Sequence, residues 1–383
     1  MSVAAGPARQ HPVRGHRPGL RVAVSVGHPT LGPAGPRRYA NALVGALSQR
    51  RSDVEVDVVP LVAPVHGAAA RRAWDLLGAP LAARRVGADL LHCLGIYPPL
   101  PLPGGIPAVL TVHDLAVRWV PRTFPPVNRT LGWSLWSRLA RRADAFVAVS
   151  ASTGRDLVDL LGVEPGRVHV VPHGVAPVFH PRPRDEVAAA RQKYALVEKY
   201  FLAVGTVEPR KNLAAVVAAL DPVRRTRPEV GLAIVGAPGW GTRPLVDRLR
   251  SGAASSGARY LGRVPDADLA ALYSGALALV YPSLFEGFGL PVLEAMACGC
   301  PVVTSARGGL AELARDAAVC VDPLAVADIA AAMARIADDE VLRRQLRRRG
   351  RDRAARYTWQ SAADGTLAVY RQAAAMALAG GRR

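Results

Sequence analysis

Short runs of apolar residues alternate with longer segments of mixed polarity along almost the whole chain. The runs cover 20–26, 54–59, 89–94, 108–112, 145–149 and 168–171 in the first half, and 200–204, 230–235, 258–261, 277–281, 301–304 and 318–321 in the second half. Continuous apolar runs are typical of parallel strands that are buried on both faces. Strands that alternate with helical segments predict doubly wound α/β domains. Six strands in each half therefore predict two such domains.

The length of 383 residues also exceeds what one ordinary core requires. We expect one Rossmann-like domain over 20–180 and a second over 181–358, because Pro177, Pro181 and Pro183 interrupt regular structure near the boundary. Residues 1–19 lack the apolar segment of a signal peptide, so they predict a disordered basic tail and a cytoplasmic protein. No apolar run reaches the length of about 18 residues that a transmembrane helix needs.

Ligands of open parallel sheets bind at the carboxyl ends of the strands, so the loops that follow strands should carry the chemistry. One such loop is Tyr281-Pro-Ser-Leu-Phe-Glu-Gly-Phe-Gly-Leu-Pro-Val-Leu-Glu294. Pro291 suits the first position of a helix, which would place the amides of Gly289 and Leu290 at an anion site for a diphosphate. Glu286 and Glu294 flank that site and could accept hydrogen bonds from sugar and ribose hydroxyls. The alternative is a surface pair of glutamates at a turn.

A second loop after a strand is Gly205-Thr-Val-Glu-Pro-Arg-Lys-Asn212. Gly205 permits close approach of the backbone to a ligand. Arg210 and Lys211 could stabilise the charge that develops on a diphosphate leaving group without a metal. Asn212 has the residue type of a helix N-cap. The alternative is a pair of solvated charges before a helix.

Two weaker signals lie in the first half. His113 ends a strand and could contact a substrate, although a lone histidine is more often structural. Gly32-Pro-Ala-Gly35 is a short glycine-rich loop before a helix that contains Tyr39. The absence of a GxGxxG pattern in this loop argues against a dinucleotide-binding dehydrogenase.

The sequence does not predict a metal site. Asp266-Ala-Asp268 has the letters of a metal-binding DxD motif, but it stands at the start of a helical segment, where capping and first-turn charge explain both residues. Cys93, Cys298, Cys300 and Cys320 lie in or beside apolar runs and are expected to be buried structural thiols.

The formal charge of +19 is large, and only Lys193, Lys199 and Lys211 among the 49 basic residues are lysines. Aromatic residues make up only 5% of the chain and no nucleic-acid-binding module is visible, so we expect no nucleic-acid partner. Peripheral binding to an anionic membrane is one explanation. It would use the arginines of 343–356 and the helix 131–142, which contains Trp133 and Trp136. Core tryptophans on a solvated arginine helix are the alternative.

Together, these motifs resemble the retaining glycosyltransferases of family four (group 1), and the resemblance extends from about Leu20 to Tyr370. The motif sequences are most similar to those of the mannosyltransferase-like subgroup. Glu286 to Glu294 matches the E-x7-E signature of that family. The segments 204–212 and 260–266 are also characteristic. The resemblance implies a GT-B fold, which consists of two facing Rossmann-like domains with a cleft between them. It also implies a last helix over 359–378 that crosses back to the first domain.

By this resemblance, the catalytic residues are Glu286, His113, Arg210 and Lys211. The donor-binding residues are Gly205, Leu261, Gly262, Phe288, Gly289, Leu290 and Glu294, and the acceptor-side loop contains Gly32 and Gly35. Glu286 would contact the donor sugar and Glu294 the ribose, while Leu261 and Gly262 would lie near the base. The chain departs from the family pattern at His173, where an asparagine is usual, and at Pro36 and Arg37, which concern the acceptor side.

The expected function is transfer of a mannose- or glucose-type hexose, with retention and without metal or other cofactor. The donor would be GDP- or UDP-linked, and the acceptor a hydroxyl of a glycan or lipid-linked precursor of a polysaccharide. The alternatives are an epimerase of the same fold and a non-catalytic nucleotide-sugar-binding subunit. The presence of all four charged donor-site residues argues against the subunit. The first domain shows no extra set of carboxylates in its sequence that would serve an epimerase.

Overall fold

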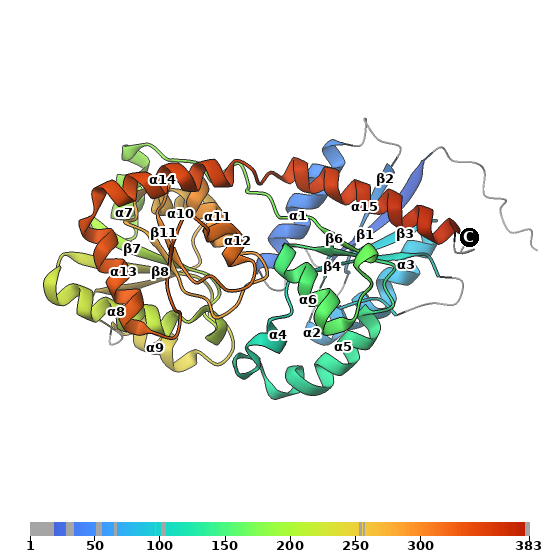
Figure 1. Ribbon diagram of the computed structural model, residues 1–383, viewed down its shortest axis with the longest axis horizontal. Coiled ribbons are helices and arrows are strands. Elements are labelled where there is room, and N and C mark those ends of the chain that lie inside the picture. Colours follow the sequence, from blue (N-terminus) through green and yellow to red (C-terminus); the bar gives the residue numbers. More distant parts are fainter. Residues whose placement is uncertain are drawn as a thin grey trace, which may run out of the picture.

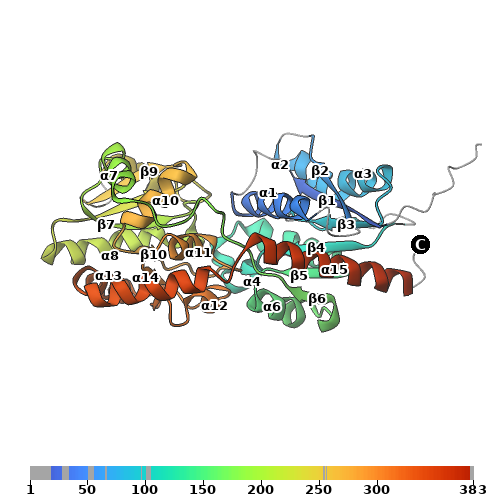
Figure 2. The same ribbon diagram turned by 90° about the horizontal axis from the view of Figure 1, so that it is seen from above.

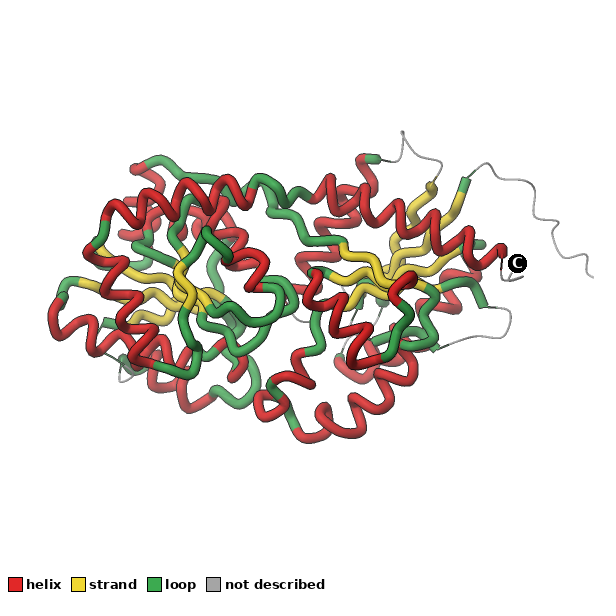
Figure 3. Tube along the Cα trace, in the orientation of Figure 1, coloured by secondary structure: helices red, strands yellow, loops and turns green. Residues whose placement is uncertain are grey.

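The computed structural model describes residues 19–27, 34–50, 56–64, 67–95, 97–100, 105–252, 255 and 257–379, and it consists of two α/β domains side by side (Figure 1). The predicted tail lies, apart from Gly19, outside the described residues. Each domain has a central sheet with helices on both faces, as the tube in Figure 3 shows. The predicted α/β class and the two doubly wound domains are therefore confirmed.

The N-terminal sheet has six strands in the order β2-β1-β3-β4-β5-β6. The strands are β1 (Leu20–Gly27), β2 (Val56–Val62), β3 (Leu90–Cys93), β4 (Ala108–Val112), β5 (Ala145–Ala148) and β6 (Val168–Val170). Neighbouring strands are parallel, and Leu20 of β1 pairs with Val56 of β2.

The C-terminal sheet has six parallel strands in the order β12-β11-β10-β7-β8-β9. They are β7 (Lys199–Val204), β8 (Val230–Val235), β9 (Ala258–Gly262), β10 (Leu279–Tyr281), β11 (Val302–Thr304) and β12 (Val319–Cys320). Each of the twelve predicted apolar runs overlaps a strand, with bounds that differ by a few residues.

Helices cover both faces of each sheet. The N-terminal domain has α1 (Ala34–Gln49), α2 (Ala68–Ala73), α3 (Ala79–Arg85), α4 (Ala116–Trp119), α5 (Trp133–Ala140) and α6 (Ala151–Leu161). The C-terminal domain has α7 (Arg184–Lys193), α8 (Leu213–Thr226), α9 (Arg243–Arg250), α10 (Asp266–Gly275), α11 (Leu290–Ala297), α12 (Leu310–Ala314), α13 (Val326–Asp338) and α14 (Glu340–Ala354). None of the helices in the described part of the chain has the length and apolar character of a membrane span.

Successive side chains of each strand point to opposite faces of the sheet, so each sheet has one core layer on each face. In β1, Val22 and Val24 pack on one face, and Ala23 packs on the other. In β7, Leu202 and Phe201 likewise belong to opposite layers. Because successive side chains of a strand point to opposite faces, two buried faces require the continuous apolar runs seen in the sequence.

The last helix, α15 (Trp359–Ala379), belongs to the N-terminal domain although it follows the C-terminal one. The chain crosses from α14 to α15, which lies along the N-terminal sheet (Figures 1 and 2). Trp359 and Tyr370 are buried in the same core layer as Val22. The Tyr370 hydroxyl lies 2.7 Å from Nδ1 of His92, whose Nε2 lies 2.8 Å from the Thr111 hydroxyl. This fully buried hydrogen-bonded chain ties α15 to β3 and β4.

One cysteine differs from its prediction. Cys93, Cys298 and Cys300 are buried free thiols, but Cys320 is exposed. It lies in β12, which is one of the two edge strands of its sheet and has a neighbouring strand on one side only. The prediction of four buried thiols is therefore wrong for Cys320.

Candidate active site between the domains

The two charged loops meet at the point where the order of the C-terminal sheet reverses. Strands β7 and β10 are neighbours, but their connections lead to opposite halves of the sheet. The loop that contains Arg210 and Lys211 follows β7, and the loop that contains Glu286 follows β10. Ligands of doubly wound sheets bind at this topological switch point, so the fold brings together the two most informative motifs of the sequence.

Both cations converge on one buried carboxylate. Nζ of Lys211 lies 2.6 Å from Oε1 of Glu286, and Nη1 of Arg210 lies 2.8 Å from its Oε2. The Lys211 ammonium also donates to the Tyr281 hydroxyl at 2.6 Å. Burial by itself would raise the pKa of Glu286, but Arg210 and Lys211 outweigh it and lower the pKa to about 2. Glu286 is therefore ionised across the physiological pH range.

A second carboxylate, Glu208, completes this cluster and has no role predicted from the sequence. Its Oε1 accepts a hydrogen bond of 2.8 Å from Nη2 of Arg210. Burial raises the pKa of Glu208, and Arg210 and Lys211 only partly offset this effect. Glu208 stands two residues before Arg210 in the motif 205–212, so its position beside two cations was the available signal. Arg210 is thus held from two sides, by Glu208 and Glu286.

The helix start after Glu286 differs slightly from its prediction. Gly289 occupies the N-cap of α11 with φ of 110°, Leu290 is the first helical residue and Pro291 the second. Only glycine adopts this backbone conformation readily. A Cβ on Gly289 would also lie 2.5 Å from the Leu310 side chain. Pro291 still needs no hydrogen-bond partner at this position, because the first turn of a helix leaves its N–H groups free.

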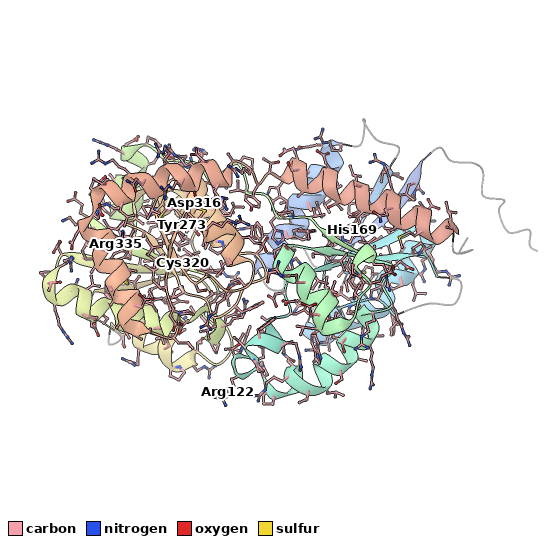
Figure 4. The ribbon with its side chains drawn as sticks, viewed as in Figure 1. Arg122, His169, Tyr273, Asp316, Cys320 and Arg335 are labelled. Carbon is pink, nitrogen blue, oxygen red and sulfur yellow. The ribbon has the colours of Figure 1, made fainter. Side chains whose placement is uncertain are left out.

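Glu294 lies one turn inside α11 and is only 2% exposed. Its carboxylate pairs with Arg38 of helix α1, and its Oε2 accepts a hydrogen bond of 3.4 Å from the Tyr273 hydroxyl. Tyr273 lies inside the C-terminal domain (Figure 4). The ion pair with Arg38 joins the two domains and was not predicted from the sequence.

Of the other predicted donor-site residues, Gly205 lies beside Lys211, whereas Leu261 and Gly262 lie in β9, which β8 separates from β7. Gly205 has φ of 142°, and a Cβ on it would lie 3.7 Å from Cε of Lys211. Leu261 and Gly262 end the edge strand β9, and the Gly262 carbonyl accepts the Gly236 N–H at 2.7 Å. Phe288 is buried against the domain boundary.

His113 faces the boundary from the N-terminal domain. Its Nε2 lies 3.1 Å from the Leu94 carbonyl, which requires a proton on Nε2 and leaves Nδ1 as an acceptor in the neutral ring. Burial lowers the pKa of His113, although the Leu94 carbonyl and Asp114 act in the opposite direction. Asp114 uses Oδ1 to accept the Ala116 N–H at 3.1 Å.

His173, the departure from the family pattern, lies at the centre of an aromatic cluster between the domains. It is only 4% exposed, stacks on His113 at 5.9 Å and contacts Tyr39 and Phe288 edge-on at 4.6 and 4.8 Å. Its Nδ1 makes no hydrogen bond within the described part of the chain.

The acceptor-side loop is only partly visible. Gly32 lies outside the described residues, whereas Gly35, Pro36 and Arg37 belong to the first turn of α1 rather than to a loop.

The domains touch directly across the site. A Cβ on Gly287 would lie only 1.7 Å from the His113 carbonyl oxygen, so the two backbones are in contact. Glu312 of α12 accepts hydrogen bonds from the N–H groups of Ala151 (3.2 Å) and Ser152 (2.8 Å), at the N-terminus of α6. These contacts describe a closed arrangement of the two domains.

Two capping predictions are confirmed only in part. Asn212 occupies the N-cap position of α8, but with φ of 57° its side chain does not cap the helix and instead donates to the carbonyls of Pro282 and Pro323. Asp266 is the first residue of α10 rather than its cap, and it pairs with Arg38, but the predicted first-turn charge of Asp266 and Asp268 is confirmed. Asp268 pairs with Lys193 at 2.7 Å. Among the described residues, no three His, Cys, Asp or Glu side chains form a group that could hold a metal.

Two family descriptions match the chain. Residues 8–179 match the family described as Glycosyltransferase Family 4, and residues 187–353 match the one described as glycosyl transferases group 1. The two matches cover the two halves that carry the two sheets.

Individual proteins of known name are also similar. The O-antigen chain mannosyltransferase B of Escherichia coli is 34% identical over 267 residues, which are 69% of this chain and 70% of that protein. The MMP alpha-(1->4)-mannosyltransferase of Mycolicibacterium hassiacum is 32% identical over 316 residues, 77% of this chain and 73% of that one. The solved structure of sucrose-phosphate synthase from Thermosynechococcus elongatus superposes with a TM-score of 0.72 at 22% identity, covering 92% of this chain and 98% of the other, so the two share a fold.

Proposed function

The chain belongs to the group 1 glycosyl transferases of glycosyltransferase family 4 and has their GT-B fold, and we propose that it transfers a mannose- or glucose-type hexose with retention and without a metal. The donor is a GDP- or UDP-linked sugar, and the acceptor is a hydroxyl of a glycan or lipid-linked molecule. The names of the two mannosyltransferase relatives support mannose as the first sugar to test.

The observation that carries the proposal is the convergence of Arg210 and Lys211 on Glu286. Both cations are held in place by buried acceptors at the switch point of the sheet. Cations that are already oriented stabilise developing negative charge without reorganising during the reaction. A departing diphosphate beside them needs no metal to stabilise its negative charge. The N–H groups at the start of α11 stabilise that charge further, because they form the positive end of the helix dipole.

Retention is supported by the hydrogen bonds of Asp114 and His113, the acidic and basic side chains on the N-terminal side of the site. An inverting enzyme needs a general base on the acceptor side of the sugar. Asp114 is committed through one oxygen to the Ala116 N–H, and His113 is committed through Nε2 to the Leu94 carbonyl. Nδ1 of His113 can accept a hydrogen bond from a sugar hydroxyl, which supports the sugar rather than removing the acceptor proton. The leaving phosphate oxygen would then take that proton on the same face.

The test is a panel of GDP- and UDP-linked mannose and glucose, with and without EDTA and with a lipid-linked or glycan acceptor. We expect release of the nucleoside diphosphate that persists in EDTA, together with a product whose proton NMR spectrum shows the anomeric configuration of the donor. A β-linked product from an α-linked donor would overturn retention. Activity that disappears in EDTA and returns with magnesium or manganese would overturn metal independence. A change of the donor sugar without transfer would indicate an epimerase instead.

Contact with an anionic membrane is the second part of the proposal, through exposed leucines of the predicted segment 131–142 rather than through its tryptophans or through α14. Trp133 and Trp136 stack on each other at 5.7 Å and pack against the core, in line with the alternative of core tryptophans. In Figure 1, α14 runs along the upper edge and α5 along the lower edge, so their arginines do not form one face. Several arginines of α14 are paired with acids, among them Arg343 with Glu340 and Arg353 with Asp316.

An apolar stripe remains on the lower edge of the N-terminal domain. Val127, Leu131 and Leu135 are 59%, 70% and 54% exposed and are spaced four residues apart, which places them on one helical face. Exposed arginines precede and follow these residues in the chain, namely Arg122, Arg138, Arg141 and Arg142. Arg122 lies at the lower edge of the molecule in Figure 4. An apolar stripe between cations fits an anionic lipid surface.

Replacing Leu131 and Leu135 together with aspartate should weaken binding to phosphatidylglycerol-containing vesicles at least 100-fold, because each buried leucine contributes about 1.5–3 kcal/mol. Flotation of the variant and the wild type measures the effect. Leu324→Asp is the control, since Leu324 is similarly exposed on the C-terminal domain. Wild-type protein that fails to float with anionic vesicles at low salt would contradict membrane contact.

A further inference from the structure

Arg38 is a side chain of the N-terminal domain that reaches into the donor half of the site. It lies in the first turns of α1 and pairs through Nη1 with Glu294, a residue 256 positions away. Nη2 pairs with Asp266, and the guanidinium lies 5.4 Å from the centre of the Phe179 ring. Arg38 is thus held by three residues, Glu294, Asp266 and Phe179, all of which come after the last strand of the N-terminal sheet in the sequence.

The main partner of Arg38 is Glu294, a buried carboxylate whose charged form requires hydrogen-bond donors. Glu294 is buried, and besides Arg38 it is contacted by the Tyr273 hydroxyl through a long hydrogen bond. Burial raises the pKa of Glu294 to about 7, even though Arg38 acts to lower it. A carboxylate in such a place is stable in its charged form only while strong donors occupy its oxygens.

A guanidinium and a ribose ring offer Glu294 the same kind of contact. The guanidinium presents paired N–H donors, and the vicinal hydroxyls of ribose present paired O–H donors. Both require the outward lone pairs of one carboxylate. The family resemblance implies that Glu294 holds the donor ribose, and in that role the ribose and Arg38 compete for it.

We propose that Arg38 is an internal substitute for the donor ribose: it occupies Glu294 in the donor-free enzyme, joins the two domains there, and is exchanged for the ribose hydroxyls when the nucleotide binds. This inference rests on the proposed function of Glu294. Asp266 and Phe179 keep the displaced guanidinium close to the site, because neither contact involves Glu294.

The exchange reduces the apparent affinity for nucleotide. If the Arg38–Glu294 pair is present in about 90–99% of donor-free molecules, the apparent Kd is about 10- to 100-fold higher than that of an unoccupied site. Arg38→Ala is therefore expected to bind GDP or UDP about 10-fold or more tightly than the wild type. A residue that contacts the nucleotide directly would give the opposite sign on removal.

The experiment is calorimetric titration of wild type, Arg38→Ala, Glu294→Gln and the double variant with GDP and with UDP. Arg50→Ala is the matched control, because Arg50 follows the same helix and forms an ion pair with Asp364 away from the site. Tighter binding in Arg38→Ala but no such gain on the Glu294→Gln background supports the exchange.

Two outcomes overturn the inference and have different meanings. Nucleotide that binds the wild type but binds Arg38→Ala equally or more weakly rules out competition and leaves the proposed function standing. If neither nucleotide binds any variant, and the donor panel also shows no turnover, both the inference and the proposed donor class fail. Thermal melting of each variant shows whether the titrated protein is folded.

Discussion

Replacing Lys211 with methionine is expected to slow turnover about 100- to 1000-fold, as the loss of one oriented donor to a developing charge does in other enzymes. The methionine keeps most of the side-chain volume but removes the ammonium that lies 2.6 Å from both Glu286 and Tyr281. Turnover with saturating donor is the measurement. Lys199→Met is the control, because Lys199 lies at the start of β7 and pairs with Glu229 at 3.4 Å on the surface.

Loss of Lys211 also affects folding, so the two effects need separation. Glu286 keeps Arg210 as a partner, but its pKa is expected to rise from about 2 because one of the two cations that lower it is gone. Stability from this group is present above the unfolded-state pKa and is lost as the pH falls toward the folded-state pKa. Lys211→Met with Glu286→Gln removes the unbalanced charge and should regain thermal stability without regaining turnover. If Lys211→Met alone turned over within about threefold of the wild-type rate, the role of Lys211 would be contradicted, since loss of an oriented donor lowers the rate far more than that.

The second large effect is expected at Gly287. Alanine would place a methyl carbon 1.7 Å from the His113 carbonyl and 2.9 Å from Cβ of Asp114, both of which belong to the opposite domain. The domains must move apart to admit it, and a displacement of about 1 Å at a reacting centre can cost about 100-fold in rate, so we expect kcat/KM to fall by about that factor or more. Thermal stability should change little, because opening the cleft relieves the clash without disrupting either core.

Gly45→Ala is the comparison for Gly287→Ala. Gly45 lies in α1, and a Cβ there would meet no atom of the described residues within 4 Å. Alanine inside a helix stabilises by about 0.5–1 kcal/mol relative to glycine, so this variant should be as active as the wild type and slightly more stable. Normal turnover in Gly287→Ala would show that the closed contact is not needed for the reaction.

Much of the fold could be predicted because buried parallel strands leave a clear pattern. Each of the twelve strands lies within or overlaps an apolar run, and the pattern alone places the two charged motifs directly after β7 and β10. The error at Cys320 arises because an apolar run does not distinguish an edge strand from a central one. The position of a strand depends on residues that are close in sequence, whereas the order of strands in a sheet depends on contacts between distant segments.

The site was harder to predict where contacts depend on the other domain. Arg38 belongs to a helix of ordinary sequence, and its pair with Glu294 follows only from how the domains close. Asn212 and Asp266 have residue types that cap helices, but nearby carbonyls and a cation compete for their side chains. Glu208 lies inside the motif 205–212, yet only the fold turns it toward Arg210.

The return of α15 to the N-terminal sheet has a consequence for synthesis. Its buried face, from Trp359 to Tyr370, fills the layer beside Val22 and Val24. While the ribosome is still making the C-terminal domain, that apolar layer is covered by α1 but not yet by α15, and Tyr370 is not yet available to His92. The domain that is translated first is thus completed last, after residues 359–379 have left the exit tunnel. The C-terminal domain can bury its own core layers earlier, so we expect its core to be completed before that of the N-terminal domain.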